Sequence, residues 1–367
     1  MVDRSWRGPR RVFLVLVVAS RKAADCPAIF SAFECGISGY RVVAVVTRPP
    51  TLAVHLLLIG VLLLGALWLP LPLYLVSLAL FGLPHIVWEM GFLRSRYAGR
   101  WPRGWWLALW LVLLVQGCVR VAVWLGAYSS VASQIVDLLS LLVLGLIVAA
   151  APAGAGWRVR SAGLILAVGV WLLLERGKVL EALLVLSILH NFTPMVMVWD
   201  MARDRSQDRG IGTLAKGMAG LFLLPLLLAF SGWSGAIQPT VLAGQMPLLQ
   251  AQWPAQWGTT HQQAILSAIV LAQCLHYYSV IVLLPHMQQQ RTGEPVLPRW
   301  ARLTTLATVA LMFAYYAVDY RGARNLYAVV AGIHAWLEWP VLLMAWLSVH
   351  ESLPATSAVR SRPGPAT

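Results

Sequence analysis

Two consecutive apolar stretches decide the fold class: residues 52–68 read LAVHLLLIGVLLLGALW, and residues 72–93 read PLYLVSLALFGLPHIVWEMGFL. A helix needs about 20 predominantly apolar residues to cross the hydrocarbon layer of a bilayer. Each stretch is close to that length, and neither contains a Lys or an Arg. The two stretches therefore predict a pair of membrane-spanning helices that follow one another directly.

The same pattern recurs along the rest of the chain, where Arg, Pro or Gly residues bound further apolar runs. These runs cover residues 104–125, 135–151, 159–174, 179–199, 212–231, 262–286, 303–318 and 325–348. We therefore expect an all-α, polytopic transmembrane helical bundle of about ten spans. The connection at 232–261 carries no charged residue, and we expect it to lie along an interface or to fold back over the bundle.

The composition excludes a soluble globular domain. Of the 367 residues, 59% are hydrophobic and 11% are charged, whereas soluble domains carry about 25% charged residues. The 18 Trp residues are typical of the aromatic belts at the two membrane–water interfaces. The four Cys residues show no C-x-x-C spacing, which argues against a disulfide framework or a Cys-ligated zinc site. The chain has no P-loop, G-x-S-x-G or H-E-x-x-H motif, so nucleotide-driven pumping, serine hydrolysis and zincin proteolysis lack support.

The basic residues predict the orientation of the bundle. With the N-terminus in the cytoplasm, 23 of the 28 Lys and Arg residues fall on cytoplasmic segments. This strong positive-inside bias supports ten spans with both termini cytoplasmic. We expect the protein in the inner (plasma) membrane of a bacterium. The net charge of +14 is spread between apolar runs rather than along one stripe. We therefore expect anionic lipid headgroups, and not nucleic acid, as its partner.

Three segments are expected. Residues 1–48 form an N-terminal extension that we expect to be poorly ordered, although its Val-rich runs Val12–Val18 and Val42–Val46 could belong to a strand–helix–strand fragment. Residues 49–350 form the transmembrane domain. Residues 351–367 form a C-terminal tail that we expect to be disordered.

Four of the eight histidines fall inside predicted spans that all run from outside to inside. Counted from the outer helix ends they lie roughly 9 to 14 residues deep, so that at ~1.5 Å per residue their levels agree within about 8 Å. If these helices are neighbours, the four imidazoles can converge near the middle of the bilayer. They are His85, His190, His276 and His334.

Two of these helices also carry a carboxylate in the same spacing. Glu89 follows His85, and Glu338 follows His334, each as H-x-x-x-E, so the two side chains share one helical face. Ionisable groups at this depth cost several kcal/mol and persist chiefly in cavities, pairs or metal sites. A purely structural interpretation, in which the histidines form helix–helix hydrogen bonds, is the alternative. Arg120 and Asp137 could simply pair near the outer face.

The donor set favours a transition metal. Neutral imidazole suits Fe, Cu and Zn, whereas an oxygen-only site for Ca²⁺ or Mg²⁺ would not use four histidines. With no thiolate in the set, we expect non-haem iron, as one or two ions. The glutamates then either orient the rings of a single site or bridge a di-iron site.

The sequence Gly82-Leu83-Pro84-His85, the later histidines on separate helices and the hydropathy profile from about residue 52 to 348 resemble the Brp/Blh family of membrane β-carotene 15,15′-dioxygenases. The resemblance implies an iron-dependent oxygenase with His85 as an iron ligand. In that family small residues and an acid–His pair follow the first histidine, whereas Ile86-Val87-Trp88-Glu89 follows it here.

We therefore expect an iron-dependent dioxygenase or other oxygenase that uses O₂ on an isoprenoid, carotenoid or other lipid-phase substrate. Glu89 and Glu338 are its candidate catalytic residues. Three alternatives use the same cluster: a haem-binding redox protein, a proton-coupled transporter, and a protein that holds a metal without turnover. The aromatic residues expected to line a substrate channel are Trp88, Tyr277, Tyr278 and Trp336.

Overall fold

The computed structural model describes residues 14–16, 43–45, 52–152, 155–203, 209–231, 259–292 and 297–347. Contacts divide the chain into two compact units, residues 1–61 and 62–367. In the first unit β1 (Leu14–Leu16) pairs antiparallel with β2 (Val43–Val45). Each strand lies within one of the two Val-rich runs. Three sequence expectations lie outside the described residues. They are the poor order of the rest of the N-terminal extension, the course of the connection over 232–258, and the disorder of the tail at 351–367.

Each predicted apolar run is helical over most of its described residues, which confirms the helical class of the membrane domain. The helices are α1 (Leu52–Trp68), α2 (Pro70–Tyr97), α3 (Arg103–Trp124), α4 (Ser130–Ala149), α5 (Gly156–Glu175), α6 (Val179–His190), α7 (Thr193–Arg203), α8 (Arg209–Ser231), α10 (Thr259–Tyr278), the π-helix η3 (Ser279–Leu283), α11 (Leu284–Thr292), α12 (Arg299–Val318) and α13 (Tyr320–Leu347).

By length and composition, eight helices in the described part of the chain can cross a membrane, with α6–α7 and α10–η3–α11 each counted as one. Two more apolar helices are shorter, at Ala53–Trp68 and Lys216–Ser231. Such a set of helices is that of a polytopic membrane protein.

Helix starts follow from local sequence. Pro70 occupies the first turn of α2, where its missing N–H costs nothing. The hydroxyl of Ser129 accepts a hydrogen bond from the Ala132 amide at 3.1 Å and caps α4. Asp319 accepts from the Gly322 amide at 2.9 Å and opens α13. Each of these features marks the residue at which a helix begins.

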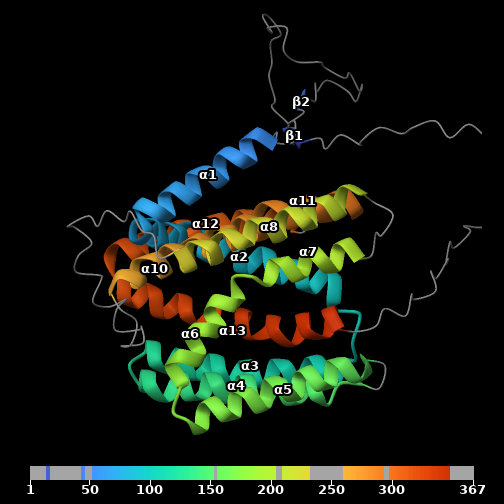
Figure 1. Ribbon diagram of the computed structural model, residues 1–367, viewed down its shortest axis with the longest axis vertical. Helices are drawn as coiled ribbons and strands as arrows, with labels where there is room; N and C mark the ends of the chain where they lie inside the picture. Colours follow the sequence, from blue (N-terminus) through green and yellow to red (C-terminus); the bar gives the residue numbers. More distant parts are fainter. Residues whose placement is uncertain are drawn as a thin grey trace, which may run out of the picture. The chain divides into compact units, whose positions relative to one another are not determined.

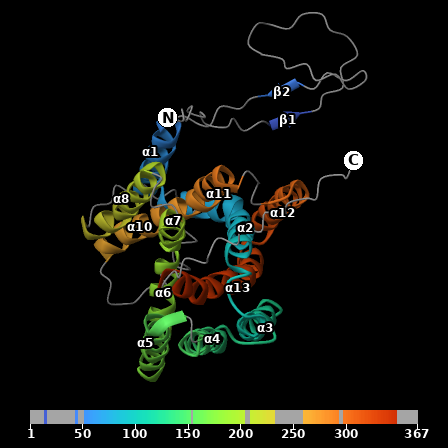
Figure 2. The same cartoon turned by 90° about the vertical axis from the view of Figure 1, so that its right-hand side faces the viewer.

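Helix α13 lies in the middle of the second unit. It packs on α3, α4 and α5 on one side and on α2, α7 and α12 on the other, as Figures 1 and 2 show. Helix α2 also contacts α10 and α12. The α10–η3–α11 span and α13 are the two most buried of the candidate spans. Of the helices that carry the candidate histidines, α2 therefore packs against both α10 and α13.

Helices α4 and α5 approach each other closely because glycines face each other across their contact. A Cβ on Gly145 would lie 3.0 Å from the carbonyl oxygen of Gly163, and one on Gly163 would overlap the backbone of α4. Small residues that allow such backbone contact are typical of helix pairs in membranes.

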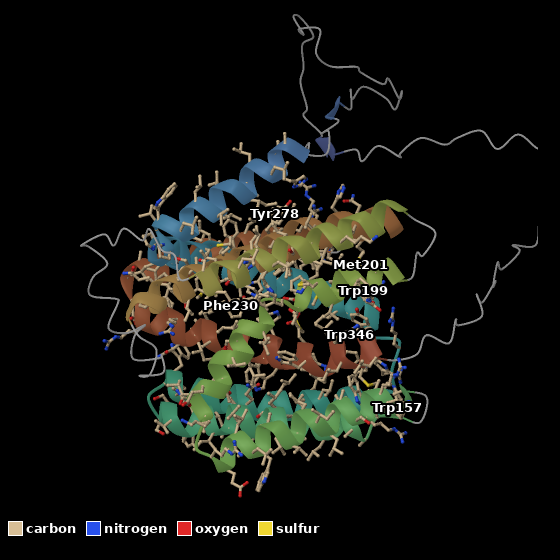
Figure 3. The ribbon with its side chains drawn as sticks, viewed as in Figure 1. Trp157, Trp199, Met201, Phe230, Tyr278 and Trp346 are labelled. Atoms are coloured by element: carbon tan, nitrogen blue, oxygen red, sulfur yellow. The ribbon has the colours of Figure 1, made fainter. Side chains whose placement is uncertain are left out.

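Side chains at one end of the helices match a membrane interface. Trp157 on α5, Trp199 on α7 and Trp346 on α13 are exposed and lie toward the same end of the helices in Figure 3. At that end the carboxylate of Asp200 on α7 accepts hydrogen bonds from Arg96 Nε at 2.5 Å and from the Tyr97 hydroxyl at 2.8 Å. These bonds join α7 to α2.

Candidate metal centre

The four candidate histidines come together. His85 lies on α2, His190 is the last residue of α6, His276 lies on α10 and His334 on α13. One ring nitrogen from each lies within 4.8 Å of all the others. Neighbouring ring centroids are 4.8 to 5.1 Å apart. The convergence expected from their common depth is present in the structure.

Both glutamates belong to the same buried group, and each is 0% exposed. Glu89 Oε2 lies 2.6 Å from His334 Nε2 and 3.4 Å from His276 Nε2. Glu338 Oε2 lies 2.7 Å from His190 Nδ1 and accepts a hydrogen bond from the Thr193 hydroxyl at 3.0 Å. Each carboxylate therefore contacts histidines of other helices.

Hydrogen bonding fixes the orientation of His85. Its Nδ1 lies 3.1 Å from the carbonyl oxygen of Phe81. Because a carbonyl only accepts, the proton of a neutral ring sits on Nδ1, and Nε2 keeps a lone pair. A neutral imidazole with its second nitrogen fixed in this way is the usual state of a histidine metal ligand.

Many polar atoms of the cluster lack a hydrogen-bond partner among the described residues. They include Glu89 Oε1, both ring nitrogens of His276, His334 Nδ1 and Glu338 Oε1. Each buried polar group without a partner costs about 1–3 kcal/mol. Nitrogen and oxygen lone pairs directed at one small volume can be satisfied together by a cation. The buried His/Glu group could therefore bind a metal ion.

The helices that carry the cluster are irregular next to it. Pro84 directly precedes His85 within α2. The span that was expected to be continuous over 179–199 breaks at Asn191–Phe192, before Thr193 and Pro194 begin α7. The π-helix η3 starts three residues after His276, and Pro285, which cannot donate a backbone hydrogen bond, follows it. π-helical turns are frequent at functional sites.

A cavity of about 530 Å³ reaches the four histidines. Two of the aromatic residues expected to line a channel, Tyr277 and Trp336, line this cavity, whereas Trp88 and Tyr278 do not. The ring of Tyr277 lies 4.4 Å from that of His85. The indole N–H of Trp336 donates to the carbonyl oxygen of Asp137 at 2.7 Å, which fixes the ring in the cavity wall.

The wall of the cavity also holds an ion pair. Arg120 Nη2 lies 2.7 Å from Asp137 Oδ2, and the Gln116 amide donates to Asp137 Oδ1 at 3.0 Å. The pairing of Arg120 with Asp137 expected from the sequence is thus confirmed. Gly332 leaves the space that the guanidinium occupies, because a Cβ there would lie 2.5 Å from Arg120 Cζ.

No protein-family model, no curated protein and no solved structure matches this chain. The Brp/Blh resemblance therefore remains a prediction, and the function has to be argued from the cluster and its cavity.

Proposed function

We propose that this protein is an integral-membrane, non-haem iron oxygenase acting on a long-chain substrate dissolved in the lipid phase. The observation that carries the proposal is the meeting of four imidazoles, which line a cavity, with two buried carboxylates. His85, His190, His276 and His334 would hold the iron, which would supply the activation of O₂. The substrate chain would reach the cluster through the cavity.

The contacts of the glutamates support a single ion with four histidine ligands. Glu89 lies against one nitrogen of His334 and Glu338 against one nitrogen of His190. A carboxylate that accepts a hydrogen bond from one ring N–H leaves the other nitrogen free to act as a ligand and raises its basicity. In this arrangement the two glutamates would face ring N–H groups and set the orientation of the rings.

The ring packing argues against the haem alternative. Axial histidines of a haem face each other across the macrocycle. Here all four neighbouring ring pairs have centroids at most 5.1 Å apart, two of them edge to face around His334. A porphyrin does not fit between rings in direct contact.

A proton-coupled transporter is the second candidate. The four histidines and the Arg120–Asp137 pair line the same cavity. Ionisable groups that line a cavity within a membrane also serve as proton relays, which favours this candidate. Metal content separates the two candidates.

The first experiment is elemental analysis with an optical spectrum on detergent-purified protein. We expect one equivalent of iron without a Soret band, and lipid-dependent O₂ consumption that is lost with the iron. A protein that holds no metal after metal-replete expression would overturn the oxygenase proposal and favour the transporter.

We also propose that α1 and α8 complete ten spans with both termini on the cytoplasmic side of a bacterial plasma membrane. The support is the alternation of basic residues along the chain and the agreement of all ten apolar runs with helices. Phosphatase and fluorescent-protein fusions at each connection test it. Activity of a periplasmic phosphatase fused at either terminus would contradict it.

A further inference from the structure

A second cavity, of about 600 Å³, lies between α2 and α3. Both helices pack on α13 but make little contact with each other, and α13 lies between them in Figures 1 and 2. The buried side chain of Leu337 on α13 lines the cavity between the two walls. This cavity is therefore a groove between α2 and α3, and among the described residues it shares no lining residue with the histidine cavity.

The walls of the groove are apolar. They are formed by Val87, Met90 and Gly91 on α2 and by Trp106 and Trp110 on α3. Trp110 is 43% exposed, so the groove opens onto the outer surface of the helices, which lipid covers in a membrane protein. Lipid tails are as apolar as these side chains. A hydrocarbon chain can therefore fill the groove without burying a polar group.

One end of the groove carries positive charge. Arg94 is the one charged residue among the described residues that line it. It lies one turn before the end of α2, and Val87 lies seven residues deeper, which is about 10 Å at ~1.5 Å per residue. Arg103, the first residue of α3, stands at the same end, because a short connection over 98–102 joins the two helices. By helical spacing Arg103 shares a face with the two tryptophans of the wall.

These two arginines have no carboxylate partner, unlike their neighbours in the sequence. Arg96 and Arg100 lie 2.5 and 3.8 Å from the carboxylate of Asp200 on α7. Arg94 and Arg103 are exposed and form no hydrogen bond or ion pair with the part of the chain that the structure describes. Their charges are therefore available to an anion that does not belong to the chain.

We propose that this groove binds one anionic phospholipid, with an acyl chain along the apolar walls and the phosphate at Arg94. A guanidinium binds phosphate oxygens through two parallel N–H···O hydrogen bonds, and Arg103 adds a second positive charge at the same end. Basic pockets between membrane helices bind anionic headgroups in this way. The charge sets the level of the headgroup, and the groove receives the chain. The site does not depend on the iron centre.

Two simpler occupants would use only half of these features. A free phosphate ion would use Arg94 and leave the apolar groove empty. A neutral lipid would use the groove and leave the arginine charges without a partner. An anionic phospholipid uses both, so its binding depends on the charge of the headgroup and on the acyl chain together.

Native mass spectrometry of the full chain in detergent tests the proposal. The added lipids are phosphatidylglycerol and phosphatidylcholine with identical acyl chains. We expect one phosphatidylglycerol to stay bound at a concentration at which phosphatidylcholine does not, and inorganic phosphate at equal concentration not to displace it. Equal retention of the two lipids, or displacement by inorganic phosphate, would overturn the proposal.

Variants of Arg94 give the second readout. Arg94→Gln should weaken phosphatidylglycerol binding at least about tenfold, a loss of about 1.4 kcal/mol, whereas Arg94→Lys, which keeps the charge, should retain most of it. The matched control is Arg160→Gln on α5, which removes the same charge from an exposed arginine that does not line the groove. Equal effects of Arg94→Gln and Arg160→Gln would reduce the binding to a general attraction and overturn the proposal.

Photo-crosslinking locates the chain. A phosphatidylglycerol with a diazirine near the middle of one acyl chain should label peptides that contain Val87–Gly91 or Trp106–Trp110. The phosphatidylcholine probe with the same chain should label the lipid-facing helices without this preference. Labelling of α5 and α12 by the phosphatidylglycerol probe as strongly as of the groove would contradict a defined site. None of these measurements requires bound metal, so their outcome is independent of the oxygenase proposal.

Discussion

Glu89 on α2 contacts His334 on α13, with 2.6 Å between Oε2 and Nε2, although a histidine stands one turn before Glu89 on its own helix. Glu338 on α13 in turn contacts His190 at the end of α6. The two H-x-x-x-E segments are thus joined across helices, and with the contact of Glu89 to His276 on α10 the glutamates connect all four helices of the cluster.

Removing one histidine should remove the metal. His85→Ala or His276→Ala takes away one of four nitrogens around one point, so we expect metal retention after purification to fall at least tenfold, measured by elemental analysis. Membrane insertion should be unchanged, because an apolar residue replaces a polar one. His55→Ala on α1, outside the cluster, is the control. Full metal content in either cluster variant would show that the histidines are not ligands.

Replacing Glu89 by Gln should weaken the site without dismantling it. The amide keeps the shape of the side chain but loses the negative charge that faces His334 and His276. We expect metal affinity to fall about 10- to 100-fold, as for other residues that support metal-bound histidines. Titration of the apoprotein with Fe²⁺ measures this.

Glu338→Gln gives the comparison, because this carboxylate contacts His190 and Thr193. We expect a similar loss. Unchanged affinity in both variants would reduce the glutamates to packing residues.

The Arg120–Asp137 pair should contribute strongly to stability. Asp137→Asn leaves the guanidinium in the cavity wall without its counter-charge, and breaking a buried pair costs about 3–5 kcal/mol. We expect unfolding in mixed detergent micelles to report a loss of up to this size. The double variant Arg120→Leu with Asp137→Leu should lie closer to the unmodified protein. A single variant as stable as the unmodified protein would refute this expectation.

The contact between α4 and α5 should not accept a methyl group. In Gly163→Ala the new Cβ meets backbone atoms of α4, which no rotamer change can move, so we expect destabilisation of about 1–3 kcal/mol. Gly169→Ala on the same helix is the control, since nothing lies within 4 Å of its Cβ position. There the better helix propensity of Ala should keep or slightly raise the free energy of unfolding. Equal effects of the two substitutions would contradict the close contact.

The helices and the common depth of the histidines could be predicted because both depend on local sequence. Runs such as 52–68 reappear as α1 with the same bounds, since apolar length alone determines a span. Depth follows from counting residues along each helix. Neither requires knowledge of which helices are neighbours.

The partners of the glutamates could not be predicted in this way. The sequence places Glu89 one turn from His85, but its contact with His334 depends on α2 packing against α13. Trp88 and Tyr278 were expected to line the cavity but do not. Whether such a side chain faces the cavity depends on which helices pack around it, and the sequence does not show this. Two helix irregularities were marked by prolines in the sequence. Pro285 lies just after the π-helix, and Pro194 lies at the start of α7, just after the break.

The spread of the histidines along the chain constrains how the protein is made. His85 leaves the ribosome when most of the chain is still untranslated, and His334 follows only with the last helix. Since translation proceeds at about 5–20 residues per second, the early histidines wait in the membrane for tens of seconds without their final partner. Loading of the proposed ion would therefore have to follow the insertion of α13, and a chain truncated before that helix would enter the bilayer without a completed cluster.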